Sequence, residues 1–361
     1  MPSRVFDPDP PAVPALPLRL GFGTFSFQTI PSEEPMKIGF CLPLNRQWKE
    51  SIERLARSNP DVELVADPDR SLAEFESLDA VVANPVPREK FEAARNLKAV
   101  FVPFVGINHL PADLLLERGV DVFNCHGNAF SVAERALAMT LAAYGRIIEF
   151  HNDLSRGKWH GFWVGKGHED FWHSLQGKPC AVLGTGAIGS ALARLLSAFD
   201  CPVTGYRRRP GAGTPPHFDR VTDDLADAIA GAELVFVALP LTAETEGLLS
   251  RDILAGMKGK FLVNVGRGGI VDEEGLYRAL AEGILAGAAI DTWYTYPAKG
   301  ETVGDPSRFP IHRLSNVVLS PHVAGSTWEA VANNAVQTVG NVAEWLRTGT
   351  CGSKVDLRAS Y

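Results

Sequence analysis

The sequence has few cysteines, no long apolar run and no block of basic residues. Its five cysteines (Cys41, Cys125, Cys180, Cys201 and Cys351) are scattered and form no CxxC pair, which favours reduced thiols in a cytoplasmic protein over a disulfide framework or a zinc site. No apolar run approaches the ~18–20 residues that a membrane-spanning helix needs. Lys and Arg total 35 against 42 Asp and Glu, a formal charge of −7, so we expect no nucleic-acid partner and no membrane partner.

The length is sufficient for two domains, and the first 35 residues differ from the rest. A chain of 361 residues fits two domains of roughly 100–200 residues each. Hydrophobic residues at 45% and charged residues at 21% are typical of globular proteins. Residues 1–35 hold eight of the 25 prolines and show no helical or strand periodicity. We expect them to be a disordered Pro-rich extension, or to precede Met36 as the working initiator.

From Met36 onward, short β-rich apolar runs alternate with helical stretches. A first series of such runs covers 37–43, 62–67, 78–85, 97–104 and 120–125, and a second covers 179–184, 202–206, 233–240, 261–266, 286–291 and 316–321. The alternation predicts βαβ units and therefore an α/β fold with parallel sheets. The second series fits a doubly wound dinucleotide-binding sheet. One long helix is expected over 131–150, and a final helix over 328–347 is expected to pack back on the first domain.

A glycine-rich turn lies between the first strand of the second series and the following helix. VLGTGAIGSALARLL contains Gly184, Gly186 and Gly189. The first glycine permits a tight turn, the second lets a pyrophosphate approach the backbone, and the third allows close packing of helix and strand. The helix N-terminus attracts the phosphate charge. The strand–turn–helix context indicates a dinucleotide site rather than a glycine turn that binds nothing.

Arginines follow the next strand at the position where an NAD-preferring site usually has an acid. Arg207 stands 18 residues after Gly189, and Arg208 and Arg209 follow it. Guanidinium groups form forked, charge-assisted hydrogen bonds with a 2′-phosphate. We therefore expect NADP(H) to be preferred, with NAD(H) possible. The alternative is a solvated basic loop that does not discriminate between the two cofactors.

Three polar residues end strands of the second series, and a glycine turn follows a strand of the first. Arg267 occurs in VGRGGIVDEEGL, Asp291 ends AAID, His322 occurs in SPHVAGST, and Gly106 occurs in FVGIN. Because ligands of open α/β sheets bind at the carboxyl ends of the strands, we expect these residues to line one cleft. Taken singly, the arginine also fits a surface ion pair, and the histidine fits a turn.

The ordered set GTGAIG, VALPLT, VNVGRGGIVDEEGL, GAAID and SPHVAGST resembles the D-isomer-specific 2-hydroxyacid dehydrogenase family, from Met36 to about Arg347. That family includes glyoxylate/hydroxypyruvate reductases, phosphoglycerate dehydrogenase and formate dehydrogenase. The resemblance implies a Rossmann-type domain, here 129–323, inserted into a smaller flavodoxin-like α/β substrate domain, here 36–128 and 324–361. It also implies a homodimer joined through the nucleotide domains.

The resemblance assigns expected roles to individual residues. Arg267 matches the arginine that binds the substrate carboxylate and polarises its carbonyl, and His322 matches the acid/base. Val105 and Gly106 match a loop whose backbone N–H groups bind the carboxylate, and Asn128 resembles the substrate asparagine of formate dehydrogenase. Asp291 matches the acid at the nicotinamide end. The other expected cofactor contacts are Gly184, Gly186, Ala187, Ile188, Gly189, Arg207, Arg208, Leu239, Pro240, Thr245 and Val265.

One position departs from the family pattern. The family usually has Glu five residues after this aspartate, paired with the histidine, and formate dehydrogenase has Gln; this chain has Tyr296. We include Tyr296 among the catalytic residues, with a phenol that orients the imidazole through one hydrogen bond. The segment 158–173 is also unusual, because Trp159, Trp163 and Trp172 alternate with histidines. It has no metal-site spacing, so we expect no metal there but an aromatic loop that packs on the cleft or across a dimer interface.

These observations predict reduction of a small 2-oxo acid to the D-2-hydroxy acid. One alternative is a formate-like oxidation, which needs no acid/base proton transfer. The other is a non-catalytic dinucleotide-binding scaffold or sensor, because the resemblance extends to C-terminal-binding-protein corepressors.

Overall fold

The structure, a computed structural model, describes residues 35–83, 85–107, 109–208 and 213–358. The Pro-rich extension up to position 34 and Arg209 lie outside the described residues. The chain divides into two compact units. The first comprises the described residues up to Asn128 and from Thr327 onward, and the second comprises Ala129–Ser326. Each unit is described by itself.

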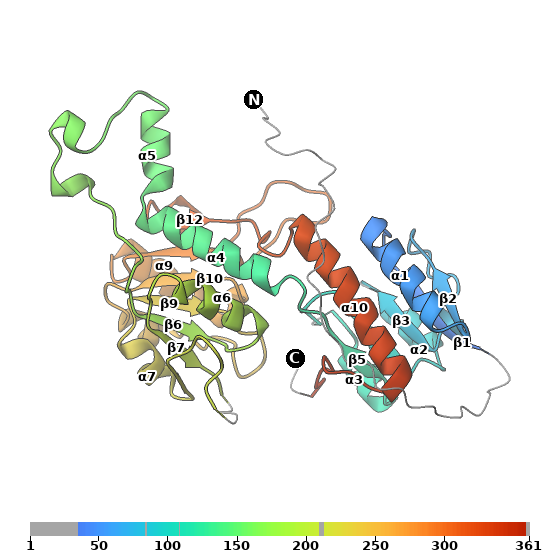
Figure 1. Ribbon diagram of the computed structural model, residues 1–361. Coiled ribbons are helices and arrows are strands. Elements are labelled where there is room, and N and C mark those ends of the chain that lie inside the picture. Colours follow the sequence, from blue (N-terminus) through green and yellow to red (C-terminus); the bar gives the residue numbers. More distant parts are fainter. Residues whose placement is uncertain (1–34, 84, 108, 209–212, 359–361) are drawn as a thin grey trace. The chain divides into compact units, whose positions relative to one another are not determined.

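The first unit is built on a parallel sheet whose described strands lie in the order β2-β1-β3-β4-β5. These strands are β1 (Met36–Cys41), β2 (Val62–Ala66), β3 (Ala80–Ala83), β4 (Ala99–Phe101) and β5 (Asp121–Phe123). One face is covered by α1 (Arg46–Ser58) and α10 (Trp328–Thr348), which pack side by side (Figure 1). Apolar residues of α2 (Arg88–Ala93) and α3 (Ala112–Glu117) share a core with the other face.

Helix α10 belongs to the first unit although it follows the second unit in the sequence. Its Val339, Val342 and Trp345 share a buried cluster with Leu55 of α1 and Phe101 of β4. The Trp345 indole meets the Phe101 ring edge-on, with 5.8 Å between ring centroids. Burial of apolar side chains of this size stabilises a fold by about 1.5–3 kcal/mol each. This packing makes the first unit discontinuous in sequence.

The second unit is built on a larger parallel sheet, whose described strands lie in the order β12-β11-β10-β9-β6-β7-β8. They are β6 (Cys180–Leu183), β7 (Val203–Tyr206), β8 (Arg220–Thr222), β9 (Leu234–Val237), β10 (Phe261–Asn264), β11 (Gly287–Ile290) and β12 (Val317–Leu319). The short edge strand β8 was not expected from the sequence, because its three residues RVT carry no apolar run. The parallel, doubly wound sheet confirms the predicted fold class.

Helices cover both faces of this sheet, as alternation of side chains along each strand requires. Val235 and Val237 of β9 pack on α7 (Leu225–Ala230), α8 (Arg251–Ala255) and α9 (Glu273–Ala281). Leu234 and Phe236 of the same strand pack on the opposite side, with α4 (Ala129–Tyr144) and α6 (Ala187–Ser197). The strand order reverses beside β6, which has β7 on one side and β9 on the other. Such a switch point is where open α/β sheets bind ligands.

The single helix expected over 131–150 is wrong, because two helices occupy this region. Helix α4 ends at Tyr144, and α5 (Ile147–Leu154) starts after Gly145 and Arg146. Arg146 has a φ of +50°, a left-handed conformation that interrupts a right-handed helix. Helix α5 and the segment 155–174 form an arm that extends away from the sheet of the second unit (Figure 1). Among the described residues, no helix is long and apolar enough to cross a membrane.

Candidate active site

The glycine turn connects β6 to α6 and provides room for a phosphate group. A Cβ on Gly189 would lie 1.8 Å from the Gly184 carbonyl oxygen, so only glycine allows α6 to pack this close to the strand. Gly184 has a φ of +105°, and a Cβ there would meet the Ala238 carbonyl oxygen at 2.7 Å. A Cβ on Gly186, in contrast, would meet no atom within 4 Å. The turn is therefore tight at its ends and open in the middle, which fits a pyrophosphate at the N-terminus of α6.

The other expected cofactor residues lie around this turn. Ala187 and Ile188 form the first turn of α6, and the loop after β9 carries Leu239, Pro240 and Thr245. The Thr245 hydroxyl donates to the Pro240 carbonyl oxygen at 2.6 Å, which closes that loop. Val265 follows β10, is buried, and packs in the apolar core that the sheet shares with α4 and α6.

Arg207 and Arg208 follow β7, next to the glycine turn. The Arg207 backbone N–H donates to the Thr222 carbonyl oxygen of β8, and its Nη2 donates to the Gly213 carbonyl oxygen at 2.7 Å. Arg208 forms an ion pair with Glu244, which lies in the loop after β9. Glu244 was not predicted from the sequence, since nothing in LTAETEG distinguishes it from the nearby Glu246.

Arg267 occupies a turn at the end of β10 that its neighbours fix. The buried Asn264 accepts a hydrogen bond from the Gly266 N–H and donates from Nδ2 to the Arg267 carbonyl oxygen, each at 3.1 Å. A Cβ on Gly268 would lie 2.4 Å from the Trp293 carbonyl oxygen, so the segment after β11 lies directly against this turn. The Arg267 side chain is half-buried, and its Nη1 donates to the Gly266 carbonyl oxygen at 2.8 Å.

Asp291 fixes the segment that carries His322. Its Oδ1 accepts hydrogen bonds from the Ser320 hydroxyl and the Val323 N–H, at 2.5 and 3.1 Å, and its Oδ2 accepts one from the Ala324 N–H at 3.1 Å. His322 itself has a φ of +58°, a conformation that costs a non-glycine residue about 1–3 kcal/mol. Hydrogen bonds to a charged group contribute about 1.5–3 kcal/mol each. The three hydrogen bonds to Asp291 come from residues on both sides of His322. Their summed free energy exceeds the cost of the left-handed conformation of His322.

The His322 imidazole lies near one positive and one negative side chain. Desolvation lowers the pKa of His322, the positive charge of Arg267 lowers it further, and the negative charge of Asp291 partly opposes both. The Tyr296 ring lies beside the imidazole, with 5.4 Å between ring centroids and 46° between ring planes. The Tyr296 hydroxyl accepts a hydrogen bond from the Trp293 N–H at 3.0 Å. The hydrogen bond expected from the phenol to the imidazole is therefore corrected to a ring–ring contact.

Four of the expected site residues thus lie at one edge of the second unit. Arg267, Asp291 and His322 follow β10, β11 and β12, which are neighbours in the sheet, and Tyr296 lies beside His322. The glycine turn follows β6, so it lies at the carboxyl ends of the same parallel strands. A guanidinium, whose fork can bind a carboxylate, and an imidazole, which can donate a proton, are therefore at the same sheet edge as the glycine turn.

The expected residues of the first unit also lie together. Val105 and Gly106 follow β4, and Asn128 follows β5, which is paired with β4. The Asn124 side chain donates to the Val105 carbonyl oxygen at 3.1 Å, and the Cys125 N–H donates to the Phe104 carbonyl oxygen at 3.2 Å. The buried Oδ1 of Asn128 accepts no hydrogen bond from the described residues.

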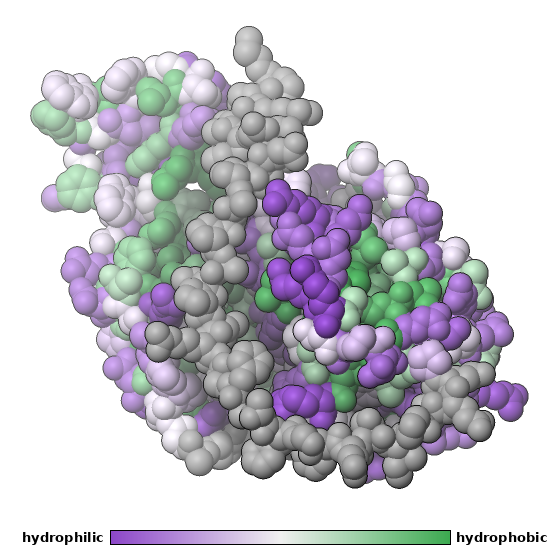
Figure 2. Space-filling view, turned by 45° about the vertical axis from the view of Figure 1, so that its right-hand side comes forward, coloured by the Kyte–Doolittle hydropathy of each residue, from purple (hydrophilic) through white to green (hydrophobic). Residues whose placement is uncertain are grey.

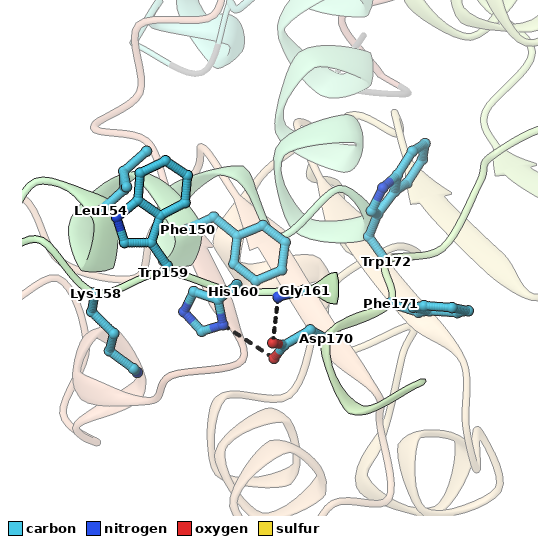
Figure 3. A pocket seen from close by; sticks show the side chains of 9 residues that line it. All are labelled: Phe150, Leu154, Lys158, Trp159, His160, Gly161, Asp170, Phe171 and Trp172. Atoms are coloured by element: carbon cyan, nitrogen blue, oxygen red, sulfur yellow. Dashed lines mark hydrogen bonds and ion pairs between the residues drawn. The ribbon is translucent and has the colours of Figure 1, made fainter. Parts of the chain in front are cut away.

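A cavity of about 570 Å³ lies in the arm (Figure 3). Its lining is mostly apolar and comprises Phe150, Leu154, Lys158, Trp159, His160, Gly161, Asp170, Phe171 and Trp172. The two ring nitrogens of His160 are hydrogen-bonded to carboxylates: Nε2 lies 2.7 Å from Asp153 Oδ2, and Nδ1 lies 3.1 Å from Asp170 Oδ1. The hydrogen bonds to Asp170 and Asp153 raise the pKa of His160.

The arm also contains a group of potential metal ligands, Glu149, Asp153 and His160. These acids already have cationic partners. The Arg146 guanidinium donates to both carboxylate oxygens of Glu149, and Lys158 Nζ lies 2.6 Å from Asp153 Oδ2. The charges are therefore balanced within the protein, and we assign no metal to the group.

Comparisons with known proteins identify the family. The family model described as D-isomer specific 2-hydroxyacid dehydrogenase, NAD binding domain, matches residues 137–324. A D-3-phosphoglycerate dehydrogenase of Archaeoglobus fulgidus is 30% identical over 82% of this chain, which spans only 55% of that protein. A glyoxylate reductase of Thermofilum pendens is 32% identical, over 72% of this chain and 75% of the reductase.

A solved structure gives the same assignment. The NADPH-dependent glyoxylate/hydroxypyruvate reductase of Sinorhizobium meliloti, in complex with citrate, aligns with a TM-score of 0.68 and 26% identity, over 89% of this chain and 98% of that chain. The chain belongs to the D-isomer-specific 2-hydroxyacid dehydrogenase family and binds a nicotinamide dinucleotide through its second unit.

Proposed function

We propose that this protein reduces a small 2-oxo acid to the D-2-hydroxy acid, with NADPH as the preferred cofactor. The observation that carries the proposal is the placement of Arg267 and His322 at the carboxyl ends of β10 and β12, at the sheet edge that also bears the glycine turn. The relatives named as glyoxylate reductases support a small 2-oxo acid as the substrate class.

A nicotinamide dinucleotide held at the glycine turn would supply the hydride that reduces the carbonyl carbon of the substrate. The Arg267 guanidinium binds the substrate carboxylate through its fork and polarises the adjacent carbonyl. The His322 imidazolium donates its proton to the carbonyl oxygen, so the product is the neutral alcohol and His322 is left uncharged. Asp291 keeps His322 in position through its bonds to Ser320, Val323 and Ala324. Its Oδ2 retains one acceptor position, which we assign to the nicotinamide end.

The preference for NADPH rests on Arg207 and Arg208, which follow β7 where a ribose-binding acid is usual. No acid stands at either position, so a 2′-phosphate would meet two guanidinium groups there, one of which is paired with the Glu244 carboxylate. The Sinorhizobium meliloti relative is described as NADPH-dependent, which supports the same choice.

A panel assay tests the reaction. NADPH and NADH oxidation are measured with glyoxylate, hydroxypyruvate and pyruvate, and NADP⁺ and NAD⁺ reduction with formate. We expect turnover with at least one 2-oxo acid and none with formate. Turnover with formate alone would favour the formate-like alternative. Tight cofactor binding without any turnover would favour the scaffold alternative.

We also propose that the protein forms a homodimer through the arm. Residues Phe162 and Trp163 of the arm are 77% and 78% exposed, and Figure 2 shows hydrophobic residues on the arm among polar ones. The same arm holds the apolar cavity lined by Phe150, Trp159 and Phe171. A two-fold dimer presents the same surface from both copies, so Phe162 and Trp163 of each copy would fill the cavity of the other. This would remove a large exposed apolar surface from water.

A further inference from the structure

The ion pair between Arg208 and Glu244 joins the loops on either side of the glycine turn. Arg208 follows β7, and Glu244 lies in the loop after β9. These strands flank β6 in the sheet, whose carboxyl end carries the turn. The ion pair therefore crosses the sheet edge at which the dinucleotide binds.

The pair is weak enough to be replaced by a phosphate. The side chains of Arg208 and Glu244 are 35% and 59% exposed, and exposed ion pairs contribute little because water screens them. A phosphate monoester carries about −1.5 to −2 charges at neutral pH and has three acceptor oxygens. It therefore competes well for a guanidinium that is already paired with a single carboxylate.

From this arrangement we infer that Glu244 determines cofactor specificity, because it occupies Arg208 and competes with the 2′-phosphate of NADPH. This inference rests on the proposed NADPH preference. NADPH has to displace the Glu244 carboxylate and then remains near its negative charge. NADH has no 2′-phosphate, leaves the ion pair intact and is not affected by it. Glu244 thus reduces the preference for NADPH that the arginines create.

Cofactor binding by the full-length chain tests the inference without any need for turnover. Dissociation constants of NADPH and NADH are measured by nicotinamide fluorescence for the parent and for Glu244→Gln. We expect Glu244→Gln to lower the Kd of NADPH by about two- to five-fold, the range of one exposed ion pair, and to leave the Kd of NADH unchanged. The gain should shrink as the salt concentration rises, because the pair is accessible to solvent.

Two further variants show whether the effect passes through Arg208. Glu246→Gln makes the same change of charge at an exposed position of the same loop and should leave both constants unchanged. In an Arg208→Gln background, Glu244→Gln should no longer tighten NADPH binding, because the guanidinium for which they compete is gone. Such a double-mutant cycle isolates the coupling between the two side chains.

The outcomes separate this inference from the proposed function. If Glu244→Gln weakens NADPH binding or leaves it unchanged, Glu244 does not compete with the phosphate and the inference is wrong. An equal gain from Glu246→Gln, or a gain that persists without Arg208, overturns it as well. If the parent binds NADH as tightly as NADPH and neither arginine variant alters the ratio, the proposed preference itself fails.

Discussion

The Tyr296 ring packs beside the His322 imidazole, with ring centroids 5.4 Å apart. The position at which the family usually has a carboxylate partner for the histidine therefore holds an uncharged aromatic ring. A carboxylate would stabilise the imidazolium and raise its pKa. The uncharged phenol of Tyr296, whose oxygen accepts a hydrogen bond from the Trp293 N–H, does not stabilise the imidazolium in this way. Desolvation and Arg267 keep the pKa of His322 below its usual value.

Replacing Tyr296 with glutamate should move the pH profile of the reaction. Reduction requires the protonated imidazole, so kcat/KM of the parent should fall as pH rises through a pKa lower than that of an ordinary histidine, because burial and Arg267 disfavour the imidazolium. Tyr296→Glu places a negative charge beside the ring and should shift this fall upward by about one pH unit or more. Tyr296→Phe is the control, since it removes only the hydroxyl and should leave the midpoint in place. An unchanged profile in Tyr296→Glu would contradict the contact between residues 296 and 322.

Replacing His322 with asparagine should remove the proton donor. We expect kcat/KM for 2-oxo acid reduction to fall by about 10²- to 10⁴-fold, the usual contribution of general acid catalysis. The Kd of NADPH should change little, because the glycine turn and Arg207 are not altered. Full activity in His322→Asn would assign the proton transfer to another group.

Replacing Arg267 with lysine keeps the positive charge but removes the fork. Carboxylate binding and carbonyl polarisation should both weaken, and we expect a loss of about 10²- to 10³-fold in kcat/KM, as for the loss of one oxyanion donor. Cofactor affinity is the control and should be retained. A variant with parental kcat/KM on every 2-oxo acid would show that Arg267 does not contact the substrate.

Replacing Arg207 with aspartate should shift cofactor preference toward NADH. Loss of a charge-assisted contact costs about 1.5–3 kcal/mol, which corresponds to roughly a ten- to hundred-fold weaker affinity for NADPH. NADH binding serves as the internal control and should be unchanged or stronger. Equal use of both cofactors by the parent would contradict this prediction.

Replacing Trp163 with alanine tests the arm as a dimer interface. Trp163 in the arm is 78% exposed, so its removal should leave the fold intact and shift the protein toward the monomer in analytical ultracentrifugation. Trp328→Ala is a matched control, because Trp328 is 61% exposed at the start of α10 in the first unit. Equal weakening of the dimer by both substitutions would show that the arm is not the specific contact.

Much of the fold was predictable, because local sequence determines it. Most strands of both sheets carry short apolar runs typical of a sheet covered on both faces, and the alternation with helices predicts parallel pairing. The end of α4 was not predicted, because Arg146 adopts a left-handed conformation that arginine rarely takes and that the sequence does not indicate. Strand β8 was missed for a similar reason, since pairing with β7 rather than an apolar pattern defines Arg220–Thr222 as a strand.

The sequence by itself determined the chemical groups of this protein: a glycine turn, an arginine fork, a histidine and arginines in place of an acid. Only the tertiary structure decided their partners, because hydrogen bonds and ion pairs join residues that lie far apart in the chain. Asp291 bonds to residues 29 to 33 positions away, and Arg208 pairs with Glu244 across β6. Neither partnership has a local sequence pattern, since both arise where parallel strands bring their carboxyl ends to one edge of the sheet.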